Sequence, residues 1–146
     1  MCKQQCDDRG GSRDSVRAGL LAEVNAFVEI VEIRRYVSEL RKIHSTMTAL
    51  GAEKLQALDR HAYGYEVAVP EHYNRVYQAN VDKLGCLSAK EATQIVIFHQ
   101  MVDSVRADVT KGGVLFEGTN NPKAFGNAAE LLEEAMELGR QLTKAK

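Results

Sequence analysis

The chain has 146 residues, a net charge of −1, 45% hydrophobic residues and 27% charged residues. This length is typical of one domain that can bury roughly two-thirds of its unfolded surface, so the core needs no disulfide bonds or structural metal to be stable. A nucleic-acid partner is not expected, because nucleic-acid-binding proteins usually concentrate basic residues on one face.

The first 14 residues are polar, contain glycine and show no periodicity. They predict a flexible tail over 1–14, ahead of a single domain over 15–146. This start has no apolar signal-peptide core, and no apolar run in the chain reaches the length of a membrane span. The odd cysteine count argues against a disulfide framework, so we expect a cytoplasmic protein in which Cys86 is a small packed residue.

The first long helix is predicted from Ser15 to Leu50, where Gly51 offers a stop. Its sequence carries two overlapping apolar stripes. One consists of Leu20, Val24, Phe27 and Val31, and the other of Ile30, Ile33, Val37, Leu40 and Met47. Two stripes predict a helix packed against neighbours on two sides, or one that leaves surplus apolar surface for another molecule.

A short helix is expected over 52–62, followed by YGYEVAV at 63–69. The alternation in 63–69 favours extended backbone, but no second strand is evident, so we predict an extended connector. Pro70 suits the first turn of a helix and Gly85 the position just past its end, which predicts a helix over 70–84.

Two further helices complete the predicted fold. Ser88 and Glu91 have the spacing of a capping box and begin a helix that ends at Gly112-Gly113. Pro122 begins the last helix, over 122–142. The predicted class is therefore all-α: a helical bundle of four main helices, with one short helix and an extended connector.

Sites of chemistry are hard to find in this sequence. No glutamate has a histidine three residues after it, so the di-iron signature of helical bundles is missing. His99 and Asp103 lie one helical turn apart and could share a cation, but a hydrogen-bonded pair at the core edge is favoured. We expect no metal, no cofactor and no catalytic residues, since no spacing demands acid–base or nucleophilic work.

Charge is unevenly distributed along the chain. Basic residues crowd the first helix around Arg34 and Arg41, and acidic residues crowd the last around Glu133. The two clusters favour solvated faces that pair loosely if the helices are neighbours, rather than a lipid or nucleic-acid contact.

The least ordinary stretch is 61–77, which holds four of the five tyrosines. Tyrosine combines a large apolar face with a polar tip, so it suits binding surfaces and equally suits gaps at helix ends. The candidate ligand or partner surface consists of Tyr63, Tyr65, His72, Tyr73 and Tyr77.

Two stretches resemble a group of small, uncharacterised bacterial proteins. In that group a helix of the type LxAEIxAxxEIIExRxY precedes a segment of the type YxxxYxANxxKIGxL and then a helix with a central aromatic residue. The matching residues here are Glu23, Glu29, Glu32, Arg34, Tyr36, Tyr73, Tyr77, Ala79, Asn80, Lys83, Gly85, Leu87 and Phe98. The resemblance covers roughly two-thirds of the chain.

The resemblance implies a mostly helical fold and no established activity. Members of the group commonly begin with one membrane-spanning helix, whereas this sequence begins with polar residues. Membrane association is therefore expected only if an anchor lies upstream. Asn80 becomes a candidate structural polar residue that fixes how its helix docks on the first.

These observations lead to two expectations about function. The first is a non-enzymatic interaction module that binds a protein partner or a second copy of itself. The second is a small-molecule or metal-binding protein that uses the region 61–77. An enzyme is the third and weakest reading.

Overall fold

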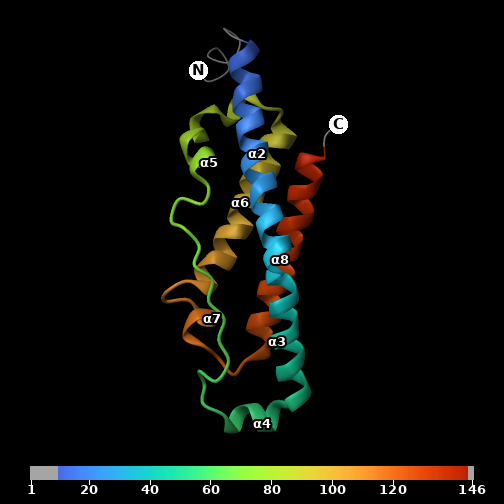
Figure 1. Ribbon diagram of the computed structural model, residues 1–146, viewed down its shortest axis with the longest axis vertical. Coiled ribbons are helices and arrows are strands. Elements are labelled where there is room, and N and C mark those ends of the chain that lie inside the picture. Colours follow the sequence, from blue (N-terminus) through green and yellow to red (C-terminus); the bar gives the residue numbers. More distant parts are fainter. Residues whose placement is uncertain (1–9, 145–146) are drawn as a thin grey trace.

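The computed structural model describes residues 10–144, with side chains from residue 13 onward. Within these residues the chain is helical and contains no strand, which confirms the predicted all-α bundle. Its long helices are α2 (Gly10–Arg34), α3 (Tyr36–Leu50), α6 (Ala89–Val109) and α8 (Pro122–Thr143). In Figure 1, α2 and α3 form one long rod beside α6 and α8.

The N-terminal rod is broken at Arg35. Buried Val31 and Leu40 are nine residues apart, so in a regular helix they would lie about half a turn out of phase, on opposite faces. Arg35 adopts a left-handed conformation (φ 58°, ψ 38°), which resets the phase so that both residues face the core. The predicted continuous helix over 15–50 is therefore wrong, and the two stripes in the sequence mark this change of phase.

The start of α2 also differs from the prediction. The helix begins at Gly10, so the flexible tail predicted over 1–14 is wrong for residues 10–14. The rest of that prediction, residues 1–9, lies outside the described residues.

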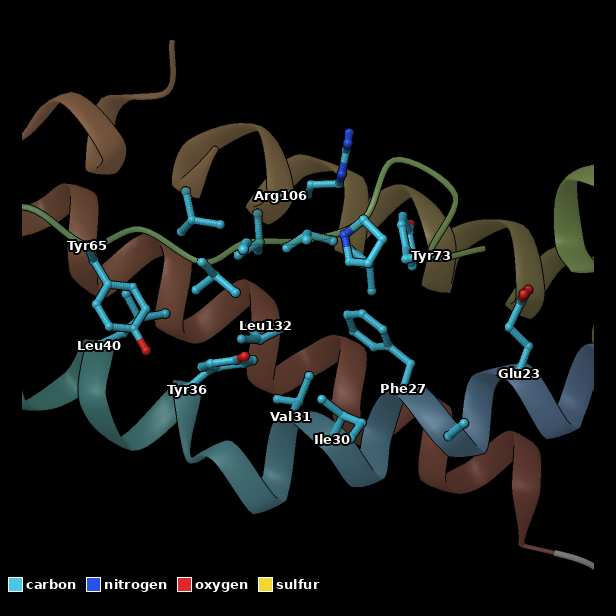
Figure 2. A pocket seen from close by; sticks show the side chains of 18 residues that line it. Glu23, Phe27, Ile30, Val31, Tyr36, Leu40, Tyr65, Tyr73, Arg106 and Leu132 are labelled. Atoms are coloured by element: carbon cyan, nitrogen blue, oxygen red, sulfur yellow. The ribbon is translucent and has the colours of Figure 1, made fainter. Parts of the chain in front are cut away.

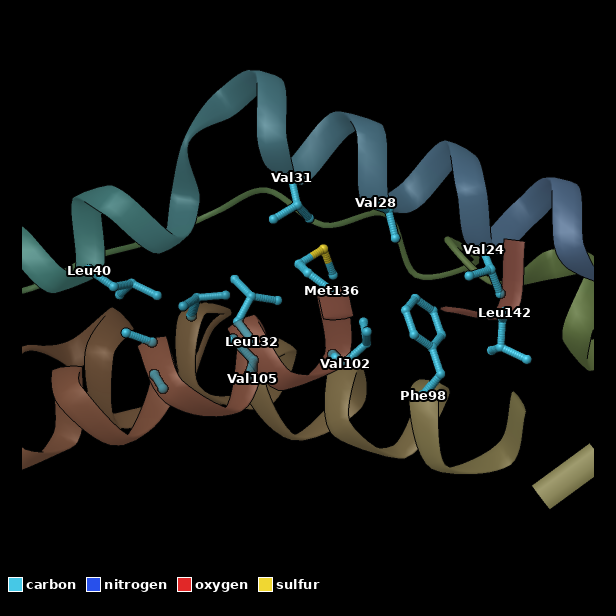
Figure 3. Packing of buried hydrophobic residues seen from close by; sticks show 14 of the residues in the cluster. Val24, Val28, Val31, Leu40, Phe98, Val102, Val105, Leu132, Met136 and Leu142 are labelled. Atoms are coloured by element: carbon cyan, nitrogen blue, oxygen red, sulfur yellow. The ribbon is translucent and has the colours of Figure 1, made fainter. Parts of the chain in front are cut away.

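Helix α8 lies at the centre of the bundle, where it packs against α2, α3 and α6. Phe98, Phe125, Leu20 and Leu40 are among the largest fully buried side chains, and full burial of such a group contributes about 1.5–3 kcal/mol. Figure 3 shows how residues of α2 and α3, such as Val28 and Leu40, face α6 and α8. The core therefore runs the length of the rods.

The chain between α3 and α6 crosses the bundle by way of the predicted connector. Helix α4 (Ala52–Ala57) ends earlier than the predicted 52–62, and residues 63–69 form no helix and run drawn out along the bundle, as expected of a connector (Figure 1). The connector runs alongside the segment after α6, which includes the short α7 (Val114–Glu117). The amides of Tyr63, Tyr65 and Val67 donate to the carbonyls of Thr119, Leu115 and Val109 at 3.2, 2.7 and 3.1 Å.

The helix predicted over 70–84 is wrong. The connector continues to Pro70, and between it and α6 the chain forms only α5 (Arg75–Ala79) and the 3-10 helix η1 (Val81–Cys86). The Asn80 side chain donates to the carbonyl of Val76 at 2.9 Å. Asparagine competes with helical hydrogen bonding in this way, and the helix ends at this residue.

The predicted start of the last helix at Pro122 is confirmed, with Asn121 as the cap before it, and the capping box at Ser88 is confirmed in part. The Ser88 hydroxyl accepts from the amide of Glu91 at 3.1 Å, but the Glu91 carboxylate pairs with Arg17 of α2.

Cys86 is disulfide-bonded, so the expectation of a packed thiol is wrong. The expectation of a reducing compartment, which came from the cysteine count, loses its support.

Candidate functional site

A pocket of about 350 Å³ lies between the N-terminal rod, the connector and α6. Figure 2 shows its walls, with Phe27 and Ile30 from α2 facing side chains of the connector and of α6. The lining residues are Glu23, Ala26, Phe27, Ile30, Val31, Tyr36, Leu40, Tyr65, Val67, Ala68, Val69, Pro70, Tyr73, Val102, Val105, Arg106, Val109 and Leu132.

The break at Arg35 and the extended connector together create this pocket. Because the left-handed residue resets the helical phase, Tyr36 and Leu40 of α3 turn to the same side as Phe27 and Val31 of α2. The connector closes the opposite side. Because an extended backbone covers less of the neighbouring helices than a helix in the same place would, space remains between the connector and these helices. Its hydrogen bonds at Tyr65 and Val67 hold it in place.

The pocket wall is strongly apolar. Valine, leucine and isoleucine side chains dominate it, and Phe27 contributes an aromatic face. The rings of Phe27 and Tyr73 are tilted against each other with centroids 5.4 Å apart. A volume of this size with mainly apolar lining and a few polar groups is typical of small-molecule sites.

Two tyrosine hydroxyls on the wall are already engaged as donors. Tyr65 donates to Glu39 at 2.5 Å and Tyr73 donates to Asp103 at 2.6 Å. Burial and these hydrogen bonds raise the pKa of both tyrosines far above the usual value. Both phenols therefore stay protonated at any physiological pH.

Glu23 lines one end of the pocket and ties α5 to α2. Its carboxylate oxygens accept hydrogen bonds from the amides of Val76 at 2.7 Å and Tyr77 at 2.9 Å. These amides belong to the first turn of α5, where backbone donors have no partner within the helix. A residue far away in sequence thus serves as the cap of this short helix.

Arg106 lines the pocket from α6. Its Nε is buried and has no hydrogen-bond partner. Figure 2 shows its side chain at the margin of the pocket, with the nitrogens pointing away from Phe27 and Ile30.

The structure spreads the predicted tyrosine and histidine surface over several places, although the rings of Tyr73 and Tyr77 both lie beside His99. Tyr65 and Tyr73 line the pocket, whereas Tyr63 pairs through its backbone with Thr119. Tyr77 stacks on His99 at 4.1 Å between ring centroids, and His72 is exposed outside the pocket wall. These residues therefore do not form one surface.

Asn80 does not dock its segment on α2 in the way expected. Its side-chain bond goes to Val76 within the same segment, and the bonds between α5 and α2 come from Glu23. The pocket residues that sequence reasoning missed are mainly on α2 and α6. On α2, the surplus apolar residues Phe27 and Ile30 were the sequence signal that could have pointed to the pocket. On α6, Val102 and Val105 follow the same pattern as residues of a closed core and gave no such signal.

His99 is 2% exposed, and neither ring nitrogen has a hydrogen-bond partner. The predicted pair with Asp103 is therefore wrong, because that carboxylate accepts from Tyr73. Burial lowers the pKa of His99 to about 4, although Asp103 acts in the opposite direction. The ring is neutral at pH 7 and packs as an aromatic side chain.

Metal ligands and membrane spans were also sought. Across residues 10–144, no three side chains of His, Cys, Asp or Glu gather in a way that could hold a metal ion. None of the helices in this part of the chain has the length and apolar composition needed to cross a bilayer. The basic and acidic clusters meet where Arg41 of α3 pairs with Glu133 of α8.

Comparison with known proteins adds no family to this description. No family model matches the chain, and no curated protein or solved structure matches it either. The resemblance to small bacterial helical proteins stays a prediction.

Proposed function

We propose that this protein binds an apolar small molecule in the pocket between α2, the connector and α6. The observation that carries the proposal is a strongly apolar pocket of about 350 Å³ between α2, the connector and α6. Of the five residues predicted for a ligand surface, only Tyr65 and Tyr73 take part in this proposed site.

Burial of apolar surface supplies the affinity in this proposal. Each methylene that leaves water contributes about 0.8 kcal/mol, which is roughly a fourfold gain in affinity. A series of straight-chain alcohols should therefore bind more tightly with each added carbon until the chain outgrows the pocket. An affinity that does not depend on chain length would contradict the proposal.

The test uses N-phenylnaphthylamine, a neutral dye that fluoresces in apolar surroundings. We expect a saturable rise in emission with the purified protein, reversed by dodecanol. The variant Ala26→Trp places an indole at the pocket from an exposed position of α2, so it should weaken dye binding at least about tenfold, or 1.4 kcal/mol. Ala22→Trp is the matched control, because Ala22 is exposed on α2 but does not line the pocket.

Two outcomes would overturn this proposal. One is the absence of saturable dye binding, and the other is equal loss of binding in both tryptophan variants. Thermal unfolding gives an independent check, since a ligand at about 100 times its Kd should stabilise the fold by about 2.7 kcal/mol.

We also propose self-association as a second candidate function, in line with the expected interaction module. Ile33 is 73% exposed and Ile30 is 50% exposed, one turn apart on α2. Paired exposed isoleucines on one helix favour contact with another apolar surface, and a second copy is the proposed partner. Light scattering should show a dimer for the wild type and a monomer for Ile33→Glu. The control Leu58→Glu changes another exposed apolar residue and should stay dimeric. A monomeric wild type would contradict the proposed self-association.

A further inference from the structure

We infer that the ligand of this pocket is an amphiphile with one negative charge, whose carboxylate is held by Arg106. This inference rests on the proposed function and adds the chemical class of the ligand. It starts from the unpartnered Nε of Arg106 on the pocket wall.

Arg106 differs from the paired arginines of the bundle in lacking a carboxylate, and from the exposed unpaired ones in having a buried Nε. Arg17 pairs with Glu91, Arg41 with Glu133, and Arg140 with Glu32. Arg106 has no such carboxylate among the described residues, although Asp103 lies one turn earlier on α6. Asp103 instead accepts the hydroxyl proton of Tyr73.

A buried donor without an acceptor costs about 1–3 kcal/mol, and more when the group is charged. Native proteins pair nearly all such groups. Its Nε is itself enclosed, so an acceptor on the bound molecule would meet the guanidinium through the terminal nitrogens at the margin of the pocket. Charge-assisted bonds between guanidinium and carboxylate are the strong form of this pairing.

The other polar groups on the wall favour this orientation. The hydroxyls of Tyr65 and Tyr73 already donate to carboxylates, and both oxygens of Glu23 accept from backbone amides. His99, the other described residue with unpartnered buried nitrogens, is not part of the wall. Arg106 is therefore the donor on the wall that is left for a ligand.

The number of charges limits the head group to a monoanion. Arg106 supplies one positive charge at all accessible pH values, and the nearby carboxylates of Asp103 and Glu23 accept from Tyr73 and from backbone amides instead of pairing with it. A single carboxylate is balanced by Arg106, whereas a dianionic phosphate would leave an unpaired charge in partly desolvated surroundings. The head group then sits at the outer edge of the pocket, with the alkyl chain against Phe27 and Val105.

The test compares dodecanoate with dodecanol, which share the chain and differ in the head group. Both compete with N-phenylnaphthylamine on the full chain, below their aggregation concentrations. We expect dodecanoate to bind at least about tenfold more tightly than dodecanol. In Arg106→Gln this ratio should fall to about one, whereas Arg75→Gln removes the same charge from an exposed position outside the pocket and should keep the ratio.

The outcomes separate this inference from the function beneath it. If both compounds bind with equal affinity to the wild type, the head-group assignment is overturned while apolar binding stands. If the two glutamine variants lower the ratio equally, a general charge effect replaces Arg106 and the inference fails. If neither compound displaces the dye, or no dye binds, the proposed function itself falls. Circular dichroism of Arg106→Gln and a second variant, Arg106→Lys, controls for loss of folding; the lysine variant should keep part of the preference.

Discussion

His99 is a buried imidazole whose cost to the fold depends on pH. Its ring stacks on Tyr77, and no acceptor or donor satisfies its nitrogens. Burial places the pKa of His99 at about 4 in the folded protein against 6.5 when unfolded. Between these values the unfolded chain binds a proton that the folded protein does not, so stability present above pH 6.5 is lost as pH falls toward 4.

We therefore expect the free energy of unfolding to fall by about 2 kcal/mol between pH 7 and pH 5 through this residue. His99→Phe keeps an aromatic ring against Tyr77 and removes the titration, so its stability should change less over that range. Urea unfolding at the two pH values measures the difference. His72→Phe, at an exposed position, should behave like the wild type, and an unchanged pH dependence in His99→Phe would disprove the assignment.

Gly139 illustrates how closely α8 approaches its neighbours. A Cβ atom at this position would lie 2.6 Å from Val28 Cγ2 and 2.9 Å from Phe98 Cε1, and Figure 3 shows Val28 and Phe98 facing each other across this region. Gly139→Ala should destabilise the protein by about 1–3 kcal/mol through overpacking.

Gly19 provides the opposite case with the same chemical change. A Cβ there would meet only Val76 Cγ1 at the ordinary distance of 3.4 Å, and alanine is the better helix former. Gly19→Ala should therefore raise stability by about 0.5–1 kcal/mol. Denaturant titration of both variants tests the pair, and effects of the same sign would contradict this view of the packing.

At the scale of elements, the break at Arg35 decides which side of the rod faces the core. A residue other than glycine in the left-handed region costs about 1–2 kcal/mol. Arg35→Gly should therefore be about 1 kcal/mol more stable than Arg35→Ala, since both lack the charge and differ in the Cβ atom. At Ala22, on a regular turn of α2, glycine should instead be about 1 kcal/mol less stable than alanine. Thermal unfolding of these variants gives the order, and a uniform preference for alanine would place the break elsewhere.

The docking of α5 on α2 depends on Glu23. Removing this carboxylate in Glu23→Ala takes the acceptor from the amides of Val76 and Tyr77, and loss of a helix cap costs about 0.5–2 kcal/mol. Hydrogen exchange should become faster at these two amides. Glu29→Ala, an exposed change on the same helix, should leave them unaffected; equal exchange in both variants would show that another contact holds α5.

At the scale of the whole molecule, the long helices could be predicted because their apolar residues recur every three to four positions. Helix α6 and helix α8 begin close to the capping residues Ser88 and Asn121 that precede them. The failures are equally specific. Two apolar stripes in the first helix were compatible with two-sided packing or a phase change, and only contact with α8 distinguishes them. The predicted helix over 70–84 fails at two places: residues 71–74 form turns, and α5 ends at Asn80, whose side chain turns back to Val76.

The sequence by itself determined that this protein is an all-α bundle and that 63–69 is extended, because helical periodicity and backbone preference act between near neighbours. The tertiary structure decided where the pocket lies. Its walls come from α2, α3, the connector and α6, and residues so far apart in the chain carry no local pattern that marks them as one site. Tyr65 and Tyr73 were identified for their chemistry, whereas Arg106 stands out only when its burial and its missing partner can be seen.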